Sequence, residues 1–274
     1  MIYDLNKSEN IGQKNNEEYD ICIIGSGAAG ITIAQSLNKY NLKIALIEGG
    51  SHEFSRQSQD IYKGKLIGDP YYPLDVARLR YLGGSTNHWG GMTRPFDEID
   101  FQRDYFGEEY KWPIKYKELN KYLSEACKIL EIKNNFEYDG NYQNVKPIKF
   151  QFSTVQFKTK YEDFLLSSKN INLFLNSNLS DLNGENRTVK SIVLESFNKK
   201  KINISAKKFV FAMGGIENSR YLLWFQKKYN NKFFDSNVLI GKYWMEHPVF
   251  TLGKAFVKKT VFINQYYSLT KDRK

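Results

Sequence analysis

The stretch that decides the fold is Tyr19–Gly50, YDICIIGSGAAGITIAQSLNKYNLKIALIEGG. It begins with a short apolar run that ends at Ile24, which is typical of a buried parallel strand. Over Ala28–Asn38 the apolar residues then recur at the spacing of one helix face. A second apolar run, Leu42–Ile47, completes a strand–helix–strand unit of about 30 residues. We therefore predict an α/β fold built on a parallel sheet.

A glycine-rich turn, Gly25–Gly30, joins the first predicted strand to the helix and has the spacing G-x-G-x-x-G. In this motif the first glycine makes a tight turn, the second lets the backbone approach a pyrophosphate, and the third lets the helix pack on the strand. The helix N-terminus offers unpaired N–H groups and a positive dipole end to the phosphates. The complete context favours a dinucleotide site over a purely structural turn.

An acidic residue, Glu48, ends the second predicted strand, 18 positions after the last glycine. Its carboxylate can accept hydrogen bonds from ribose hydroxyls, and it disfavours the 2′-phosphate of NADP. The acid does not separate FAD from NAD. The positions predicted to hold the dinucleotide at this end are Gly25, Ser26, Gly27, Ala28, Gly30 and Glu48.

A second glycine-rich stretch, RYLGGSTNHWGGMTRP, lies at Arg80–Pro95. Its four glycines fall at positions 83, 84, 90 and 91, which indicates backbone brought close to a flat or bulky group. Hydrogen-bonding side chains, an imidazole and an indole ring lie between these glycines. The glycine-rich loop at 83–91 argues against an NAD-dependent dehydrogenase.

With both glycine-rich stretches in view, the chain resembles the glucose–methanol–choline (GMC) oxidoreductases, a family of FAD enzymes. Further segments match that family in order: the Trp112-Pro113 entry to a predicted helix, the strand beginning at Asn178-Leu179, the strand and turn Phe209–Arg220, and a G-x-x-x-x-x-H-P motif at Gly241–Pro248. The resemblance covers most of residues 19–250. The ordered set of matches is more specific than any one of them.

The resemblance implies a Rossmann-like FAD-binding domain assembled from separated segments, together with a substrate domain built on a β-sheet. Within that frame the flavin and pyrophosphate would be lined by Gly84, Ser85 and Asn87, the adenine would meet the backbone at Leu179, and Ala212 would lie near the adenosine half. The predicted ranges are a polar lead-in at 1–18, the FAD-binding domain at 19–110 and 171–247, a helical insertion at 111–170, and the start of the substrate sheet at 248–274.

His88 precedes Trp89, and this pair resembles the flavin loop of the pyranose-oxidase and fructose-dehydrogenase branch of the family. In pyranose oxidases that histidine is bonded covalently to the 8α-methyl group of the flavin. The resemblance therefore implies two alternatives for His88: a covalent link to FAD, or an imidazole that only hydrogen-bonds or packs beside the ring.

The family oxidises a CH–OH group by passing a hydride to flavin N5 while a histidine takes the hydroxyl proton. That histidine lies in the C-terminal part of the family's chains, and no histidine follows His247 here. We therefore expect the FAD-binding part of an alcohol or sugar oxidoreductase, with the C-terminal part absent and no catalytic residue present. The alternative is a catalytically silent flavin-binding or partner-binding subunit. A fragment, a split enzyme with a complementing C-terminal chain, and a degenerate pseudoenzyme all stay open.

Composition and residue spacing argue against nucleic-acid binding, a metal site and a membrane span. The net charge of +10 is spread along the chain, which gives no basic stripe for nucleic acid. Cys22 and Cys127 have no cysteine or histidine neighbours, so we expect small buried side chains and no metal site. We expect His52 to be solvated and His247 to be structural. No apolar stretch reaches the roughly 18 residues of a membrane span, and no signal peptide is evident, so the default location is the cytoplasm.

Overall fold

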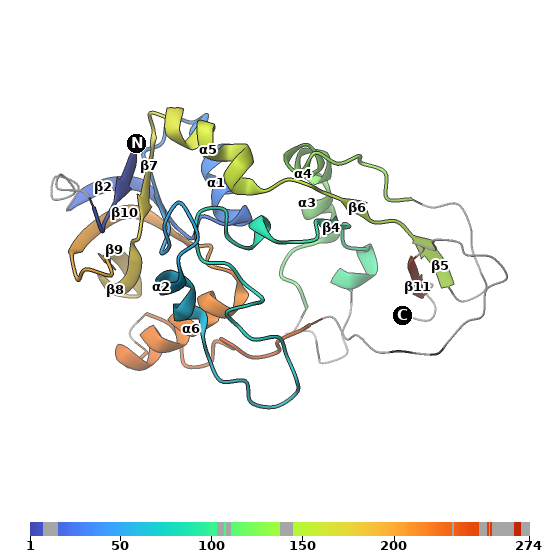
Figure 1. The fold of residues 1–274 in the computed structure, drawn as a ribbon. Coiled ribbons are helices and arrows are strands. Elements are labelled where there is room, and N and C mark those ends of the chain that lie inside the picture. Colours follow the sequence, from blue (N-terminus) through green and yellow to red (C-terminus); the bar gives the residue numbers. More distant parts are fainter. Residues whose placement is uncertain are drawn as a thin grey trace. The chain divides into compact units, whose positions relative to one another are not determined.

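The computed structural model describes residues 1–7, 16–102, 107, 111–137, 145–231, 233–246, 251, 253 and 266–269. The chain forms two compact units. The first comprises Met1–His88 and Gln156–Met245, and the second comprises Trp89–Val155 and Glu246–Lys274. The boundaries of these units differ from the domain ranges expected from the sequence. Figure 1 shows the chain coloured from the N-terminus to the C-terminus.

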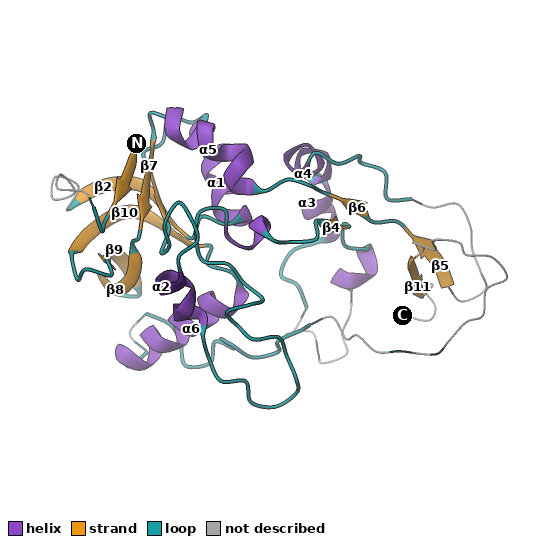
Figure 2. Ribbon diagram, in the orientation of Figure 1, coloured by secondary structure: helices purple, strands orange, loops and turns teal. Residues whose placement is uncertain are grey.

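The first unit is built on a seven-stranded sheet (Figure 2). Its order is β1 (Ile2–Asp4), β7 (Ile171–Leu175), β3 (Ile44–Ile47), β2 (Glu17–Ile24), β10 (Lys201–Phe211), β9 (Thr188–Glu195) and β8 (Asn178–Glu185). The strands from β1 to β10 in this order are all parallel, whereas β9 and β8 continue the sheet in antiparallel pairing. The expectation of an α/β fold with a parallel sheet is confirmed.

Helices cover both faces of this sheet. The helices and 3₁₀ turns of the unit are α1 (Ala28–Asn38), α2 (Arg56–Gln59), η2 (Asp60–Tyr62), η3 (Gly84–Asn87), α5 (Phe157–Ser167) and α6 (Gly215–Lys228). Because side chains alternate along a strand, β2 presents Ile23 to α1, where it approaches Gly30. Cys22 and Ile24 point to the other face and share a core cluster with Phe225 of α6. Figure 1 shows α1 and α5 side by side.

Both cysteines are buried and free, as the sequence predicts. Cys22 lies at the centre of the sheet with no exposed surface. Burial raises the pKa of the Cys22 thiol because the core does not solvate a thiolate. The thiol is therefore an inert packing group, since the thiolate is the reactive form.

The N-terminal residues differ from the expected polar lead-in. Ile2–Asp4 form β1 at the edge of the sheet, and Leu5 is fully buried. The terminal ammonium of Met1 donates a hydrogen bond of 2.8 Å to the carbonyl oxygen of Ile171. The physical reason is that β7 would otherwise leave an unpaired edge, and even three residues of chain can satisfy it. A three-residue strand carries too little periodicity to be recognised from sequence.

The second unit is described only in part. Its elements are β4 (Met92–Thr93), η4 (Glu98–Phe101), α3 (Tyr116–Asn120), α4 (Leu123–Leu130), β5 (Val145–Ile148), β6 (Gln151–Phe152) and β11 (Tyr266–Leu269). β4 pairs with β6, and β5 pairs with β11, both antiparallel. The helix predicted after Trp112-Pro113 is divided into α3 and α4, with Lys121 and Tyr122 between them. Most of the substrate-sheet range expected at 248–274 lies outside the described residues.

None of the helices in the described part of the chain is both long enough and apolar enough to cross a membrane.

Candidate functional site

The candidate site lies at the carboxyl edge of the parallel strands of the first unit. β2 lies between β3 and β10, so the residues that follow these strands meet there. Gly25 N donates to Ile47 O at 2.8 Å, and Ala212 N donates to Ile24 O at 2.7 Å. Helix α1 connects β2 to β3, whereas β10 joins on the other side. In open α/β sheets ligands bind outside the carboxyl ends of the strands at such a change of direction.

The turn between β2 and α1 requires glycine at two positions. Gly25 has a φ of +109°, and a Cβ there would lie 2.4 Å from the carbonyl oxygen of Ala212. A Cβ on Gly30 would lie 1.8 Å from the carbonyl oxygen of Gly25. Neither gap can hold a carbon atom, so both glycines are fixed by backbone packing. The turn can close against β10 and α1 only with these residues.

The N-terminus of α1 is open. Gly27 is the N-cap and supplies no side-chain hydrogen bond, and the first turn of α1 contains no acidic residue. A Cβ on Gly27 would meet nothing within 4 Å. The first N–H groups of α1 therefore have neither a capping side chain nor a carboxylate of the first turn as partner, and there is room above them. This cradle fits an anion such as a diphosphate, because the helix dipole favours negative charge at this end.

The carboxylate of Glu48 is held beside this cradle. Glu48 is 6% exposed, and its Oε1 accepts a hydrogen bond of 2.7 Å from Gly50 N. Its Oε2 accepts one of 2.5 Å from Ser26 Oγ. Ser26 belongs to the glycine turn, so the carboxylate is tied to the turn itself. Each carboxylate oxygen has capacity for a further bond, which suits the hydroxyl groups of a ribose.

The second glycine loop meets the first one. Gly83 N donates to Ser26 O at 3.0 Å. Gly84 has a φ of +57°, and a Cβ there would lie 3.2 Å from Gly27 Cα. Leu82 N also donates to Ser51 O at 3.1 Å, just beyond Glu48. Two glycine-rich segments that are more than 50 positions apart in the sequence thus share the end of α1.

Helix α5 holds the second loop in place. Thr86 Oγ1 donates to Gly83 O at 2.7 Å and accepts from Phe157 N at 3.1 Å. Asn87 Nδ2 donates to Leu82 O at 2.9 Å. A Cβ on Gly83 would lie 2.7 Å from Lys158 N, so the loop and the start of α5 are in close contact. The Asn87 side chain therefore has a structural partner within its own loop.

The remaining predicted binding residues occupy different environments. Ser85 Oγ accepts a hydrogen bond of 3.2 Å from Leu79 N. His88 is exposed at the end of η3. Leu179 points into the core on β8, so only its backbone is left for a ligand. Ser177 N donates to Glu48 O at 2.9 Å, which places the chain just before β8 beside Glu48. His247 lies outside the described residues.

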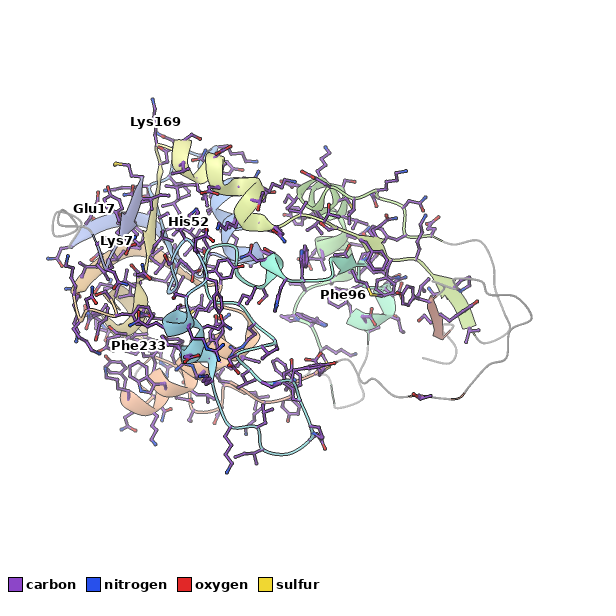
Figure 3. All side chains as sticks on the ribbon, in the orientation of Figure 1. Lys7, Glu17, His52, Phe96, Lys169 and Phe233 are labelled. Atoms are coloured by element: carbon purple, nitrogen blue, oxygen red, sulfur yellow. The ribbon has the colours of Figure 1, made fainter. Side chains whose placement is uncertain are left out.

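His52 differs from the expected solvated histidine (Figure 3). Its Nδ1 lies 3.1 Å from Glu53 Oε1, and its Nε2 contacts Glu162 Oε1 of α5. Glu53 also contacts Lys158 Nζ. The physical reason is that the loop after Gly50 runs along α5, which brings residues more than 100 positions apart into contact.

A buried ion network beside the site was not found from sequence. Glu217, in the first turn of α6, is 4% exposed and lies 3.0 Å from Arg78 Nη1 and 2.6 Å from Arg220 Nη2. Burial alone would raise the pKa of Glu217, but the hydrogen bonds from Arg220 and Arg78 outweigh it and lower the pKa below its usual value. The Arg78 guanidinium stacks on the Tyr62 ring at 3.9 Å. Burial raises the pKa of Tyr62 to about 12.

The sequence contains one local indication of this ion network. Glu217 lies within the Phe209–Arg220 segment that resembles the family, and an acid at the start of a helix suits the helix dipole. Its arginine partner could not be chosen from the sequence. No group of three or more metal-ligating side chains is found among the residues that the structure describes.

Comparison with known proteins gives matches among solved structures. No protein-family model matches the sequence, and no curated protein matches it. Formate oxidase is similar with a TM-score of 0.48 and 17% identity, over 76% of this chain and 48% of that chain. A variant of formate oxidase from Aspergillus oryzae RIB40, described for its effect on FAD modification, has a TM-score of 0.48 and 18% identity over the same shares. Pyridoxine 4-oxidase from Mesorbium loti has a TM-score of 0.47 and 17% identity, over 73% of this chain and 50% of that chain. The chain thus spans about half the length of these structures.

Proposed function

We propose that the first unit binds FAD at the carboxyl edge of its parallel strands. The observation that carries the proposal is the convergence of three features at the N-terminus of α1: the uncapped Gly27 cradle, the buried Glu48 carboxylate and the second glycine loop at Gly84. An uncapped helix end suits a diphosphate, and an acid at the end of the next strand suits a ribose diol.

The roles of the residues follow from their positions. The N–H groups after Gly27 would hold the diphosphate, and Glu48 would accept hydrogen bonds from the ribose of the adenosine half. Gly84 would allow the second loop to approach the cofactor without a side chain in the way. Ser85, Asn87 and His88 follow Gly84 and extend toward the flavin half in this proposal. Ala212 borders the turn at Gly25 and would lie on the adenosine side.

The choice of FAD over NAD rests on the second glycine loop. Its contact with Gly27 gives it a place in the same site, and its sequence resembles the flavin loop of the GMC family. Bound FAD supplies a two-electron acceptor for a hydride. The chain would then contribute binding, orientation and exclusion of water from the diphosphate.

An absorption spectrum tests the proposal directly. Protein made with ample riboflavin, or reconstituted with FAD, should show bound flavin absorbance, and a Gly27→Val variant should lose it. Colourless protein that FAD cannot load would overturn the proposal.

Denaturation in acid or SDS then separates the two alternatives for His88. Flavin that stays with the polypeptide in the wild type and is released in His88→Ala indicates a covalent link, whereas complete release from both indicates packing or hydrogen bonding only.

We further propose that the whole enzyme oxidises a CH–OH group of an alcohol or sugar. Anaerobic mixing of the FAD-loaded protein with a panel of sugars and alcohols tests this activity, alone and with a complementing C-terminal chain. Bleaching of the flavin by one substrate class supports the oxidoreductase. Flavin that light reduces but no substrate reduces supports the silent flavin-binding subunit instead.

The proposal of a complementing chain is supported by apolar side chains on the first unit. Leu223 and Trp224 of α6, and Trp244 and Met245 beyond it, are all more than 40% exposed. Contiguous exposed apolar patches mark interaction sites, and in this proposal the partner is a complementing chain. A monodisperse monomer that binds no added C-terminal chain would contradict this proposal.

A cytoplasmic location and the lack of a nucleic-acid partner stay predictions.

A further inference from the structure

Arg80 is a buried cation at the start of the second glycine loop. It is 8% exposed. Its Nη1 donates to Ser58 Oγ and its Nη2 donates to Asn178 Oδ1, both at 2.8 Å. Both acceptors are neutral, and none of the ion pairs between described residues includes Arg80. A buried charge without a paired ion is costly, so the hydrogen bonds to Ser58 and Asn178 have to hold this guanidinium.

The guanidinium packs directly against the turn that follows Glu48. A Cβ on Gly49 would lie 2.1 Å from Arg80 Nη2, and a Cβ on Gly50 would lie 2.1 Å from Arg80 O. Glycine is therefore required at position 50, where the clash is with backbone, and at position 49 any side chain would displace the Arg80 guanidinium. The same turn orients Glu48, because Gly50 N donates to Glu48 Oε1 at 2.7 Å. Arg80 thus packs against the turn whose backbone holds the carboxylate.

Arg80 is itself fixed by three elements. Ser58 and Gln59 of α2 bond its backbone, with Ser58 Oγ donating to Arg80 O at 3.0 Å and Arg80 N donating to Gln59 Oε1 at 3.0 Å. Asn178 anchors its side chain from the start of β8. The Tyr62 ring lies 5.8 Å from its guanidinium. The side chain cannot swing away from the Glu48 turn without breaking these bonds.

We propose that Arg80 is a positioning residue that acts through Glu48. It fixes the Glu48–Gly50 turn by packing, so that Glu48 presents its free acceptor sites to the ribose diol of an adenosine nucleotide. This inference rests on the proposed dinucleotide site. It assigns to Arg80 a role in adenosine affinity although the side chain need not touch the ligand.

A double-mutant cycle in the full chain tests the coupling. Calorimetry gives the dissociation constants of ADP and FAD for the wild type, Arg80→Lys, Glu48→Gln and the double variant. Lysine keeps the charge but lacks the planar fork whose two nitrogens donate to Ser58 and Asn178, so we expect Arg80→Lys to weaken binding about tenfold in the wild-type background. In the Glu48→Gln background the same change should weaken binding less than about twofold, because the group through which Arg80 acts is already altered.

Arg56→Lys is the matched control, since Arg56 lies on α2 but its side chain is 70% exposed. It should leave both dissociation constants unchanged. An equal loss in both backgrounds, or no loss in either, would overturn the role of Arg80. A wild type that binds neither ADP nor FAD would instead overturn the proposed function.

A second variant keeps the test decisive if Arg80→Lys folds poorly. Asn178→Ala removes the acceptor of Nη2 and leaves the guanidinium in place. It should weaken ADP binding by about threefold, again only when Glu48 is intact. Riboflavin, which lacks the adenosine half, should bind all these variants equally. A loss that extends to riboflavin would show a general structural defect and contradict the inference.

Discussion

Two neighbouring strands of the sheet, β2 and β10, each end in a glycine turn that is followed by a helix. The two helices differ in whether their first turn contains an acidic residue. The β2–α1 turn leaves the helix N-terminus without a capping side chain or an acid in its first turn. The β10–α6 turn also has a glycine N-cap, Gly214 with a φ of +83°, but Glu217 lies in the first turn of α6. Glu217 is buried and bonded to two arginines.

Asn218 adds a second internal contact at the β10–α6 turn. Its Oδ1 accepts from Met213 N at 3.1 Å, and its Nδ2 donates to Phe211 O at 3.0 Å, so the end of β10 is closed by the helix itself. The dipole of α6 is thus matched by the chain's own carboxylate, whereas that of α1 has no such partner in its first turn. The comparison explains why we propose an anion site at the β2–α1 turn and none at the β10–α6 turn, where Glu217 supplies the negative charge.

The largest expected effect comes from Gly30→Ala. The new Cβ would overlap the Gly25 carbonyl oxygen, so β2 and α1 have to separate. We expect a loss of more than about 3 kcal/mol in the free energy of unfolding, together with loss of FAD binding. Denaturant unfolding and FAD titration measure both. A stable, FAD-binding variant would refute the close packing that sets the first turn.

Glu217→Gln should come next, because it removes the internal anion of the second turn. We expect a loss of about 2 to 3 kcal/mol, below that for a fully buried pair since the Arg220 side chain is 49% exposed. The folded pKa of Glu217 is lowered, so its contribution is complete above the unfolded value near 4.5 and is lost as the pH falls through the folded value.

Urea unfolding between about pH 3 and pH 7 measures this dependence. The difference between the wild type and Glu217→Gln should shrink below about pH 4.5. Glu195→Gln is the control, because Glu195 pairs with Lys199 and Lys201, whose side chains are well exposed, and such pairs contribute little. A pH-independent difference would mean that Glu217 acts by packing and not by charge.

Gly27→Ala should differ from Gly30→Ala by lowering FAD affinity without a large loss in the free energy of unfolding. Its Cβ meets no protein atom within 4 Å, so the free energy of unfolding should change by less than about 1 kcal/mol. The methyl group would nevertheless occupy the space proposed for the diphosphate, and we expect FAD affinity to fall by at least about tenfold. Melting curves and FAD titration separate the two effects. Unchanged affinity would place the diphosphate elsewhere.

Ser26→Ala should give the smallest effect. It removes the hydroxyl that donates to Glu48 Oε2 and leaves the bond from Gly50 N intact. We expect ADP affinity to fall by about threefold, the loss of one supporting hydrogen bond. Calorimetry with ADP measures it. A loss as large as that of Glu48→Gln would show that Ser26 contacts the nucleotide directly.

Part of the site could be read from local sequence. The turn at Gly25–Gly30 and the acid at Glu48 lie within one strand–helix–strand unit, where spacing alone predicts which residues share an end of the sheet. The resemblance of the second loop predicted its place near a flavin, but nothing in its residues revealed that Gly84 packs on Gly27. Arg80 gave no signal, because its partners come from segments 22 and 98 positions away.

The sequence by itself determined β2 and β3, the glycine turn between β2 and α1, and the acid that follows β3, because periodicity and backbone freedom are local properties. Only the tertiary structure decided which carboxylates are paired with arginines, and which helix N-terminus has no capping side chain or acidic residue of its own. The neutralisation of Glu217 by Arg78 and the packing of Arg80 on Gly49 join segments distant in the chain. Such contacts depend on how the segments pack in three dimensions, and spacing along the sequence does not encode that arrangement.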